Sequence, residues 1–204
     1  MKQIDSYINE KLKLNKDSKV EYRYVPESWS GLRTLVRKLL KERGLDADLN
    51  DIDTSKITDM SNLFTDLDPY NIDISKWNMS NVTNTYCMFR ECHHFNSDLS
   101  KWDMHNVEES SFMFMNCEKF DSDLSKWDVS KIQYMFYMFG NCFDFNSDLS
   151  KWDVHNVRDM DNLFENCIKL NCDFSSWTVD GHCKIENVFK GCDLIKNTPD
   201  WYKQ

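Results

Sequence analysis

Large apolar residues recur every 25 positions along most of this chain. The spacing is kept without insertion or deletion from about residue 49 to residue 192. The repeating columns are Trp77, Trp102, Trp127, Trp152 and Trp177; Phe64, Phe89, Phe114, Phe139, Phe164 and Phe189; and Cys92, Cys117, Cys142, Cys167 and Cys192. Fixed periods of roughly 20–50 residues are typical of solenoids and propellers. Because a propeller blade needs about 40 residues for its four strands, a period of 25 favours a solenoid with one strand per coil.

Each repeat contains two hydrophobic patterns. In residues 147–154, Leu149, Trp152 and Val154 point inward around a short extended segment. Apolar residues then follow at a spacing of three to four, which predicts a short helical arc, α or 3₁₀, at Val157, Met160, Leu163, Phe164 and Cys167. One coil cannot bury its apolar face alone, so neighbouring coils must stack. The pattern predicts an α/β repeat, a leucine-rich-repeat-like solenoid of about six coils, over residues 45–192.

The two ends of the chain do not follow the repeat. We expect residues 1–44 to form a cap of helix, strand and helix, at 3–12, 19–25 and 28–44. The last of these has a Ser at its start and Gly44 after its final turn, the usual start and stop signals. An uncovered first coil invites end-to-end association, so we expect this helix to cover it. Residues 193–204 should close the last coil, with Trp201 one position short of the repeat.

Charge separates these parts. The chain carries 25 Lys and Arg against 34 Asp and Glu, a net charge of -9. Residues 1–44 hold 11 and 6 of these, a net +5, and the remainder holds 14 and 28, a net -14. Nucleic-acid binding rests largely on phosphate contacts, so we expect none for the acidic solenoid and allow it only for the basic cap.

Targeting signals are missing from the sequence as given. No stretch reaches the ~18 apolar residues that span a bilayer, so we expect no membrane partner. The first residues show no apolar signal core and no lipid-attachment cysteine. We expect a cytoplasmic protein, and a cell-surface one only if a leader has been removed.

The sequence contains no recognisable catalytic motif. Gly-rich phosphate loops, GxSxG and HExxH are all absent, so we predict no catalytic residue, no metal and no cofactor. Column cysteines suit small buried fillers, although disulfides between neighbours or a zinc site are alternatives. The Asp73, Asp98, Asp123, Asp148 and Asp173 column could bind calcium, but Asp accepting backbone N–H groups at each turn is the simpler interpretation.

We expect partner binding at columns in which some coils carry a different type of residue from the others. The middle coils carry aromatic side chains where the outer coils are mostly polar: Tyr86, Phe112, Tyr134, Phe136 and Tyr137. Neighbouring exposed aromatics are interface candidates. Alternatively, Tyr86 and Phe112 turn inward, because the Met60 column shrinks to Thr85 and Ser110 beside them. That alternative does not extend to the coil with the full-sized Met135, where an interface is slightly favoured.

Three segments carry a family resemblance. FNSDLSKWDMHNV (95–107), FDSDLSKWDVSKI (120–132) and FNSDLSKWDVHNV (145–157), with MF at 88–89, 113–114 and 138–139, resemble the BspA-like leucine-rich-repeat family over about residues 45–192. The resemblance implies a non-enzymatic solenoid, typically on bacterial surfaces, for adhesion or protein recognition. The opening IDSYINEKLKLNK (4–16) resembles leaders of small bacteriophage proteins, which implies a phage-encoded protein acting inside a bacterium.

We therefore predict a non-enzymatic repeat scaffold that binds a protein partner through the variable columns of its middle coils. The alternative is an acidic inhibitor, encoded by a phage or mobile element, that binds a basic host or defence protein. A second alternative is a bacterial surface adhesion protein. The sequence does not identify the partner or the oligomeric state.

Overall fold

The computed structural model describes residues 22–203. The expected helix at 3–12 and the start of the expected strand at 19–25 lie outside these residues. Two helices are present in the described part of the chain: α2 at Trp29–Arg43 and a 3₁₀ helix, η1, at Asp200–Tyr202. The α2 helix occupies the segment predicted from sequence. Ser28 caps it by accepting a hydrogen bond from the Gly31 amide at 3.2 Å, and Gly44 follows it with a φ of 98°.

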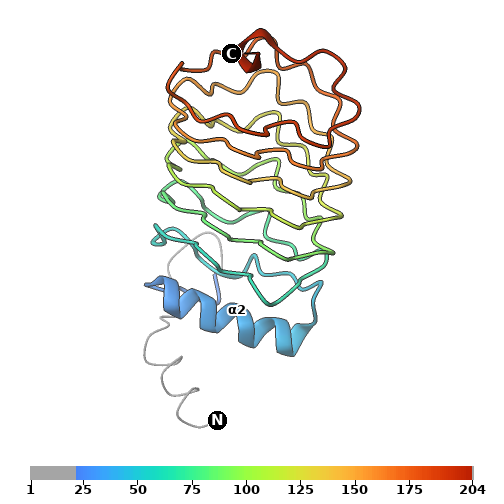
Figure 1. Cartoon of the computed structure of the whole chain (residues 1–204). Helices are drawn as coiled ribbons and strands as arrows, with labels where there is room; N and C mark the ends of the chain where they lie inside the picture. The colour runs from blue at the N-terminus through green and yellow to red at the C-terminus, as the bar shows by residue number, and fades with distance from the viewer. Residues whose placement is uncertain (1–21, 204) are drawn as a thin grey trace.

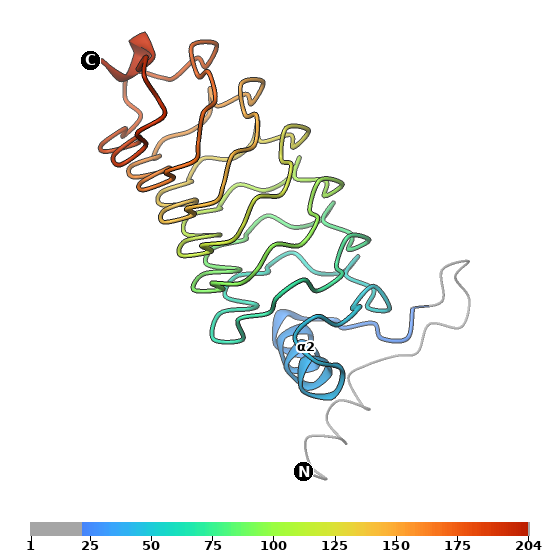
Figure 2. The same cartoon turned by 90° about the vertical axis from the view of Figure 1, so that its right-hand side faces the viewer.

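Between these helices the chain winds into stacked coils, one for each 25-residue repeat (Figures 1 and 2). Parallel bridges join the residue at one position to the same position in the next coil, in the series Asp59, Asn84, Glu109, Tyr134, Asp159 and Lys184. Alternate residues beside these bridges donate their backbone N–H to a carbonyl 24 residues further on. In one coil, for example, Met135 binds Asp159 and Tyr137 binds Asp161, both at 3.0 Å.

The arcs differ from the helical segments expected from the apolar spacing. Within residues 22–203 they consist of turns, because their alternate N–H groups bond to the next coil rather than along a helix. Two residues in each full arc also have a positive φ, such as Phe112 at 59° and Asn116 at 63°, which a helix does not allow. The short extended element differs too: residues 147–154 make no bridge, and the five bridges that join successive repeats from Asp59 to Lys184 lie in the Asp159 column. Only at the N-terminal end does the extended column pair, between Asp48 and Asp73.

The apolar columns fill the space inside the coils. Phe89 and Phe114 stack with their ring centroids 5.5 Å apart, and Trp102 and Trp127 stack at 6.5 Å. Each column tryptophan donates its indole N–H to a carbonyl 28 residues earlier, as Trp127 does to Leu99 at 2.9 Å. This bond explains how tryptophan can repeat in a buried column, since its one polar group is satisfied in every coil.

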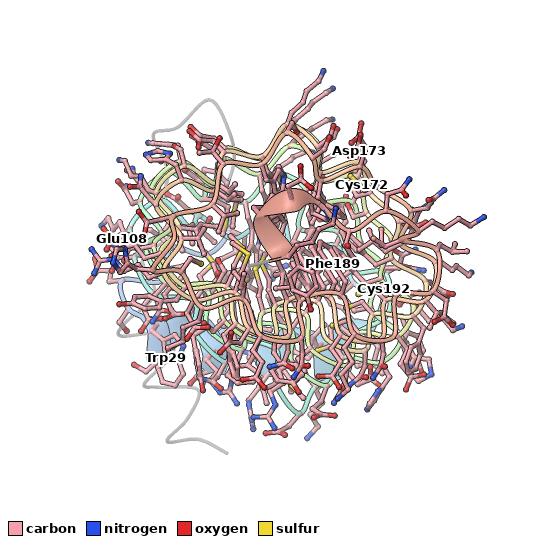
Figure 3. The ribbon with its side chains drawn as sticks, turned by 45° about the horizontal axis from the view of Figure 1, so that its top comes forward. Trp29, Glu108, Cys172, Asp173, Phe189 and Cys192 are labelled. Carbon is pink, nitrogen blue, oxygen red and sulfur yellow. The ribbon has the colours of Figure 1, made fainter. Side chains whose placement is uncertain are left out.

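The two ends of the stack are covered differently. At one end α2 lies across the first coil (Figure 1), burying Leu32, Leu35, Val36, Leu39 and Leu40 against it. At the other end, seen in Figure 3, η1 places Trp201 on Trp177 at 5.9 Å between centroids. The Trp201 indole donates to the Phe174 carbonyl at 2.9 Å, so it continues the tryptophan column in spite of its shifted position in the sequence.

Candidate functional site

Four of the five predicted interface residues form one surface group, which we call the aromatic cluster: Tyr86, Phe112, Phe136 and Tyr137. Tyr86 meets the Phe112 ring edge to face at 5.8 Å, and Phe112 stacks on Tyr137 at 5.9 Å. Phe136 meets both Phe112 and Tyr137 edge to face at 4.9 Å. Tyr86 is 37% exposed and the other three rings are half-buried. The cluster therefore spans three successive coils as a continuous aromatic surface.

The alternative in which Tyr86 and Phe112 fill a gap left by smaller neighbours does not describe this arrangement. Thr85 and Ser110 are fully buried and their hydroxyls bond to each other at 3.0 Å. Thr85 also bonds to the Glu109 carbonyl at 3.1 Å. The two small residues thus satisfy one another inside the coil, while the rings of Tyr86 and Phe112 remain partly exposed.

Two cluster residues occupy backbone positions that suit asparagine. The residue at this position has a positive φ of 52–59° in six successive coils: Asn62, Cys87, Phe112, Tyr137, Asn162 and Asn187. Asparagine tolerates the left-handed region, whereas other non-glycine residues lose about 1–2 kcal/mol there. Phe112 and Tyr137 therefore hold their rings on the surface at a conformational cost that the outer coils avoid.

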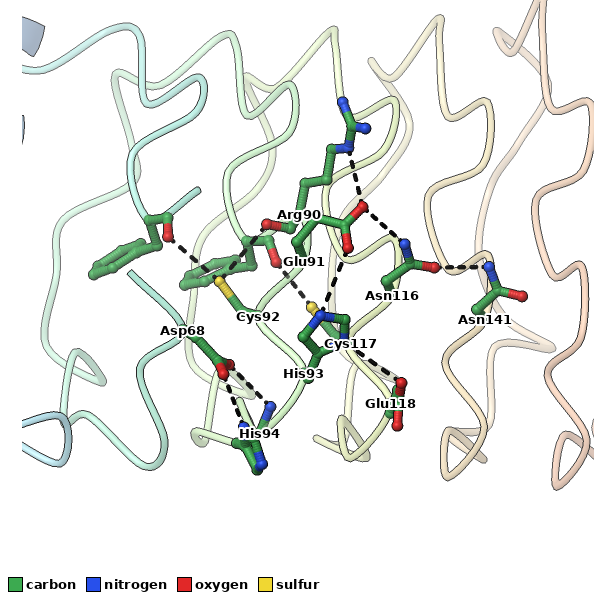
Figure 4. A network of polar contacts seen from close by, with 12 residues as sticks. Asp68, Arg90, Glu91, Cys92, His93, His94, Asn116, Cys117, Glu118 and Asn141 are labelled. Carbon is green, nitrogen blue, oxygen red and sulfur yellow. Dashed lines mark hydrogen bonds and ion pairs between the residues drawn. The ribbon is translucent and has the colours of Figure 1, made fainter. Parts of the chain in front are cut away.

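A second left-handed column shows that the middle coils do not accept aromatic residues at every such position. In this column Asn116, Asn141 and Asn166 form a chain of side-chain amide bonds at 2.7 Å. Glu91 begins the chain by accepting from Asn116 at 2.9 Å, as Figure 4 shows. Among the left-handed positions of the described coils, aromatic residues therefore occur only in the column that carries Phe112 and Tyr137.

Gly140 makes room for the Tyr137 ring. A Cβ atom at Gly140 would lie 2.5 Å from Cδ1 of Tyr137, far inside contact distance. The same column has Thr65, Arg90, Met115, Glu165 and Lys190 in the other coils. The Tyr137 ring therefore lies over the backbone of Gly140, the one residue of this column that has no side chain.

Glu165, one coil beyond Gly140, lies beside the tyrosine hydroxyl. Hydrogen bonding with this carboxylate raises the pKa of Tyr137 to about 12. Glu165 is 8% exposed and pairs with Lys190 at 2.7 Å. This buried carboxylate favours the neutral phenol.

Tyr134 lies outside the ring contacts but departs from its column in another way. In the neighbouring coils this position caps the amide two residues later: Asn84 accepts from Tyr86 at 2.9 Å and Glu109 from Ser111 at 2.7 Å. Tyr134 cannot do so, and the Phe136 amide makes no hydrogen bond to any described residue. Tyr134 is 40% exposed, so this coil presents a further aromatic surface in place of a capping bond.

The remaining candidate chemistry is taken up by structural contacts. All eight cysteines are free thiols, and the column cysteines are buried, with burial raising the pKa of thiols such as Cys117 and Cys167. In the Asp column each carboxylate accepts the amide of the serine two residues later, as Asp123 does from Ser125 at 2.9 Å. Across residues 22–203, no three His, Cys, Asp or Glu side chains gather so as to hold a metal ion.

A separate groove of about 610 Å³ is polar and contains none of the five aromatic candidates. Its walls include Glu108, Lys131, His155, Arg158 and Asp180. Both histidines in it face an aspartate close by in the sequence, as His155 does Asp153 at 2.7 Å. This groove shows no arrangement that singles it out as a second site.

Sequence reasoning named the aromatic residues but missed two of their supports, Gly140 and Glu165. The signal for the first was present: Gly140 is the one glycine in its column, three residues after the tyrosine. The signal for the left-handed column was the asparagine that recurs in the outer coils. Glu165 had no sequence signal, because its link to Tyr137 depends on the direction in which the ring lies.

Comparison with known proteins gives a family and no closer relative. The model of a repeat family matches two overlapping segments, residues 34–142 and 111–201. No curated protein matches the chain, and no solved structure does. Within residues 22–203 there is no helix with the length and apolar character needed to cross a membrane. The two matches together cover most of the sequence, so this chain belongs to the family described as "Mycoplasma protein of unknown function, DUF285".

Proposed function

We propose that this protein is a non-enzymatic scaffold, a leucine-rich-repeat-like solenoid of the BspA-like type, that binds a protein partner through the aromatic cluster. The observation that carries the proposal is the placement of Phe112 and Tyr137 at left-handed positions where three of the other four coils have asparagine. Backbone strain that persists at a surface position is a feature of functional sites. Aromatic side chains also supply much of the binding energy at protein interfaces.

Stability alone gives no reason for this cluster. Replacing Tyr137 with asparagine would relieve about 1–2 kcal/mol of left-handed strain. It would also lose about half of the ~1.5–3 kcal/mol that full burial of a large apolar side chain contributes, since the ring is half-buried. The two effects nearly cancel, so the folded chain gains little from the ring. Partner binding, rather than stability, is then the reason for the ring at this position.

The test compares partner capture by wild-type protein and by the F112N/Y137N variant, using lysate of the cells that encode the chain. We expect a protein that the wild type retains and the variant loses, while the melting temperature changes by only a few degrees. The matched control is Y70N, which removes a tyrosine that is 45% exposed and outside the cluster. Equal capture by F112N/Y137N, or equal loss with Y70N, would refute the role of the cluster.

A second candidate is the acidic inhibitor of a basic protein, favoured by the net charge of -14 on residues 45–204. The Asp column is part of this charge, and hydrogen bonds from nearby serines lower the pKa of Asp98 and Asp123, so these carboxylates stay ionised in more acidic solution as well. This function predicts capture that weakens steeply as salt is raised. Capture through the aromatic cluster should instead persist at high salt, so a salt series separates the two.

A further inference from the structure

In the arcs, a row of four backbone bonds between successive coils points in one direction. In one interface Met160 donates to Lys184 at 2.9 Å, and Asn162 to Glu186 at 2.7 Å. Two more bonds continue the row, Phe164 to Val188 at 3.0 Å and Asn166 to Lys190 at 2.7 Å. The three interfaces before it have the same four donors and four acceptors. Each arc therefore presents N–H groups toward the C-terminal end and carbonyls toward the N-terminal end.

The last coil repeats this row without a partner. Its four donors are the amides of Ile185, Asn187, Phe189 and Gly191, and none makes a hydrogen bond to a described residue. Asn187 and Gly191 keep the positive φ of the preceding coils, 57° and 75°, so the backbone has the same shape as in an occupied interface. The η1 helix packs on Trp177 and Phe189 and leaves these amides unbonded.

The opposite end of the stack is closed. The equivalent carbonyls of the first coil belong to Asp59, Ser61, Leu63 and Thr65. The α2 helix covers this coil, and the Trp29 indole donates to the Ser61 carbonyl at 2.6 Å. The stack thus has an open row of donors at one end and a covered row of acceptors at the other.

This asymmetry restricts what can bind the open row. A second donor row cannot pair with it, so two C-terminal ends do not join. An ordinary strand edge offers N–H and C=O groups together and would satisfy only half of its own groups there. The matching surface is the carbonyl row of the same repeat, which four interfaces of this chain already show in full.

We propose that the row at Ile185, Asn187, Phe189 and Gly191 is a docking edge for the carbonyl row of a second copy, and that α2 prevents this contact by covering that row. Copies then join head to tail only where α2 has left the first coil. One or two bonds in each interface run the opposite way, such as the bond from Lys184 to Arg158 in the last one, but the four bonds of the row set the preferred direction.

The test uses full-length variants and measures molar mass by light scattering after size-exclusion chromatography. Leu35→Asp with Leu39→Asp places charges in the buried face of α2 and uncovers the first coil. Ile185→Pro removes one donor from the open row, and Ile185→Val is its matched control, because valine keeps the amide. Tryptophan fluorescence and urea unfolding establish that each stack is folded.

Four results are expected. Wild type is a monomer of 24.4 kDa, and L35D/L39D forms oligomers that grow with concentration. Adding I185P to L35D/L39D restores the monomer, whereas adding I185V does not. An equimolar mixture of wild type and L35D/L39D/I185P gives a 1:1 dimer, since one supplies the donors and the other the carbonyls.

Three results would overturn the proposal: a folded L35D/L39D that stays monomeric, oligomers that I185P does not reduce, or no dimer in the mixture. Oligomers that survive I185P would show non-specific association of exposed apolar residues. If L35D/L39D does not fold, Leu32→Asp serves in its place, because it loosens only the part of α2 next to Trp29 and Ser61. These outcomes are independent of the aromatic cluster, which both wild type and variants retain.

Discussion

The contact between Tyr137 and Gly140 allows a sharp test of how the aromatic cluster is built. Replacing Gly140 with alanine adds one methyl group, 2.5 Å from Cδ1 and 3.3 Å from Cε1 of the Tyr137 ring. The ring has to move, and it is held by Phe112, Phe136 and its interaction with Glu165. Overpacking of this kind costs about 1–3 kcal/mol, so G140A should destabilise the wild-type chain by that amount.

The same substitution should have the opposite sign when the ring is gone. Gly140 does not have a positive φ, so alanine fits its backbone. In a Y137N background the methyl group enters empty space, and the reduced freedom of the unfolded chain should stabilise the protein by about 0.4–1 kcal/mol. The double-mutant cycle therefore predicts a coupling of about 1.5–4 kcal/mol between the two positions.

Urea unfolding of the four proteins, followed by tryptophan fluorescence, measures this coupling. Near-ultraviolet circular dichroism adds a direct signal from the displaced tyrosine. Arg90 and Met115 serve as column controls: R90A and M115A do not add an atom under a ring, so their effects should not depend on Tyr137. If G140A has the same effect with and without Tyr137, the ring does not lie over this position and the argument fails.

Two further changes test the same coil. Y134N restores a side chain that can accept from the Phe136 amide, as Asn84 does in its own coil, and should raise the free energy of unfolding by about 0.5–1.5 kcal/mol in urea titrations; a neutral or lower value would contradict the lost cap. The raised pKa of Tyr137, about 12, means that the folded state favours the neutral phenol. The stabilisation is complete below the unfolded pKa of about 10 and disappears as pH rises toward 12. E165Q should lower the pKa of Tyr137 in absorbance titrations at 295 nm, whereas E118Q, remote from the ring, should not.

The sequence predicted the repeat, because burial forces the same residue types to recur in every coil. The tryptophan, phenylalanine and cysteine columns are buried as expected, and α2 follows the signals at Ser28 and Gly44. The helical arc expected from the sequence is a series of turns in the structure. A spacing of three to four residues also fits successive turns whose amides bond to the next coil. Apolar periodicity reports which residues face inward, but it does not report where the backbone hydrogen bonds go.

The candidate site was also predicted only in part, because a column of residue types does not report the backbone conformation. Departures from a column reveal that Phe112 and Tyr137 are unusual, but only the backbone angles reveal that asparagine is the residue these positions prefer. The sequence also grouped Tyr134 with the other aromatics, whereas its ring makes no contact with the cluster and its effect is on the Phe136 amide. Such differences arise because neighbouring positions in an arc point in different directions.

The position of the aromatic cluster along the stack follows from how repeat proteins distribute their stability. Each coil is held by its own interactions and by its two neighbours, so a coil at either end has only one stacking interface with another coil. The left-handed strain of an aromatic residue, a lost cap at Tyr134 and a glycine at position 140 each cost a coil about 0.5–2 kcal/mol before any gain from packing of the rings. Two of these three changes occur only in the coil of residues 134–140, which has coils bonded on both sides. A middle coil can retain its fold with these losses, and this explains why asparagine persists in the coils nearest the ends while the aromatic surface lies between them.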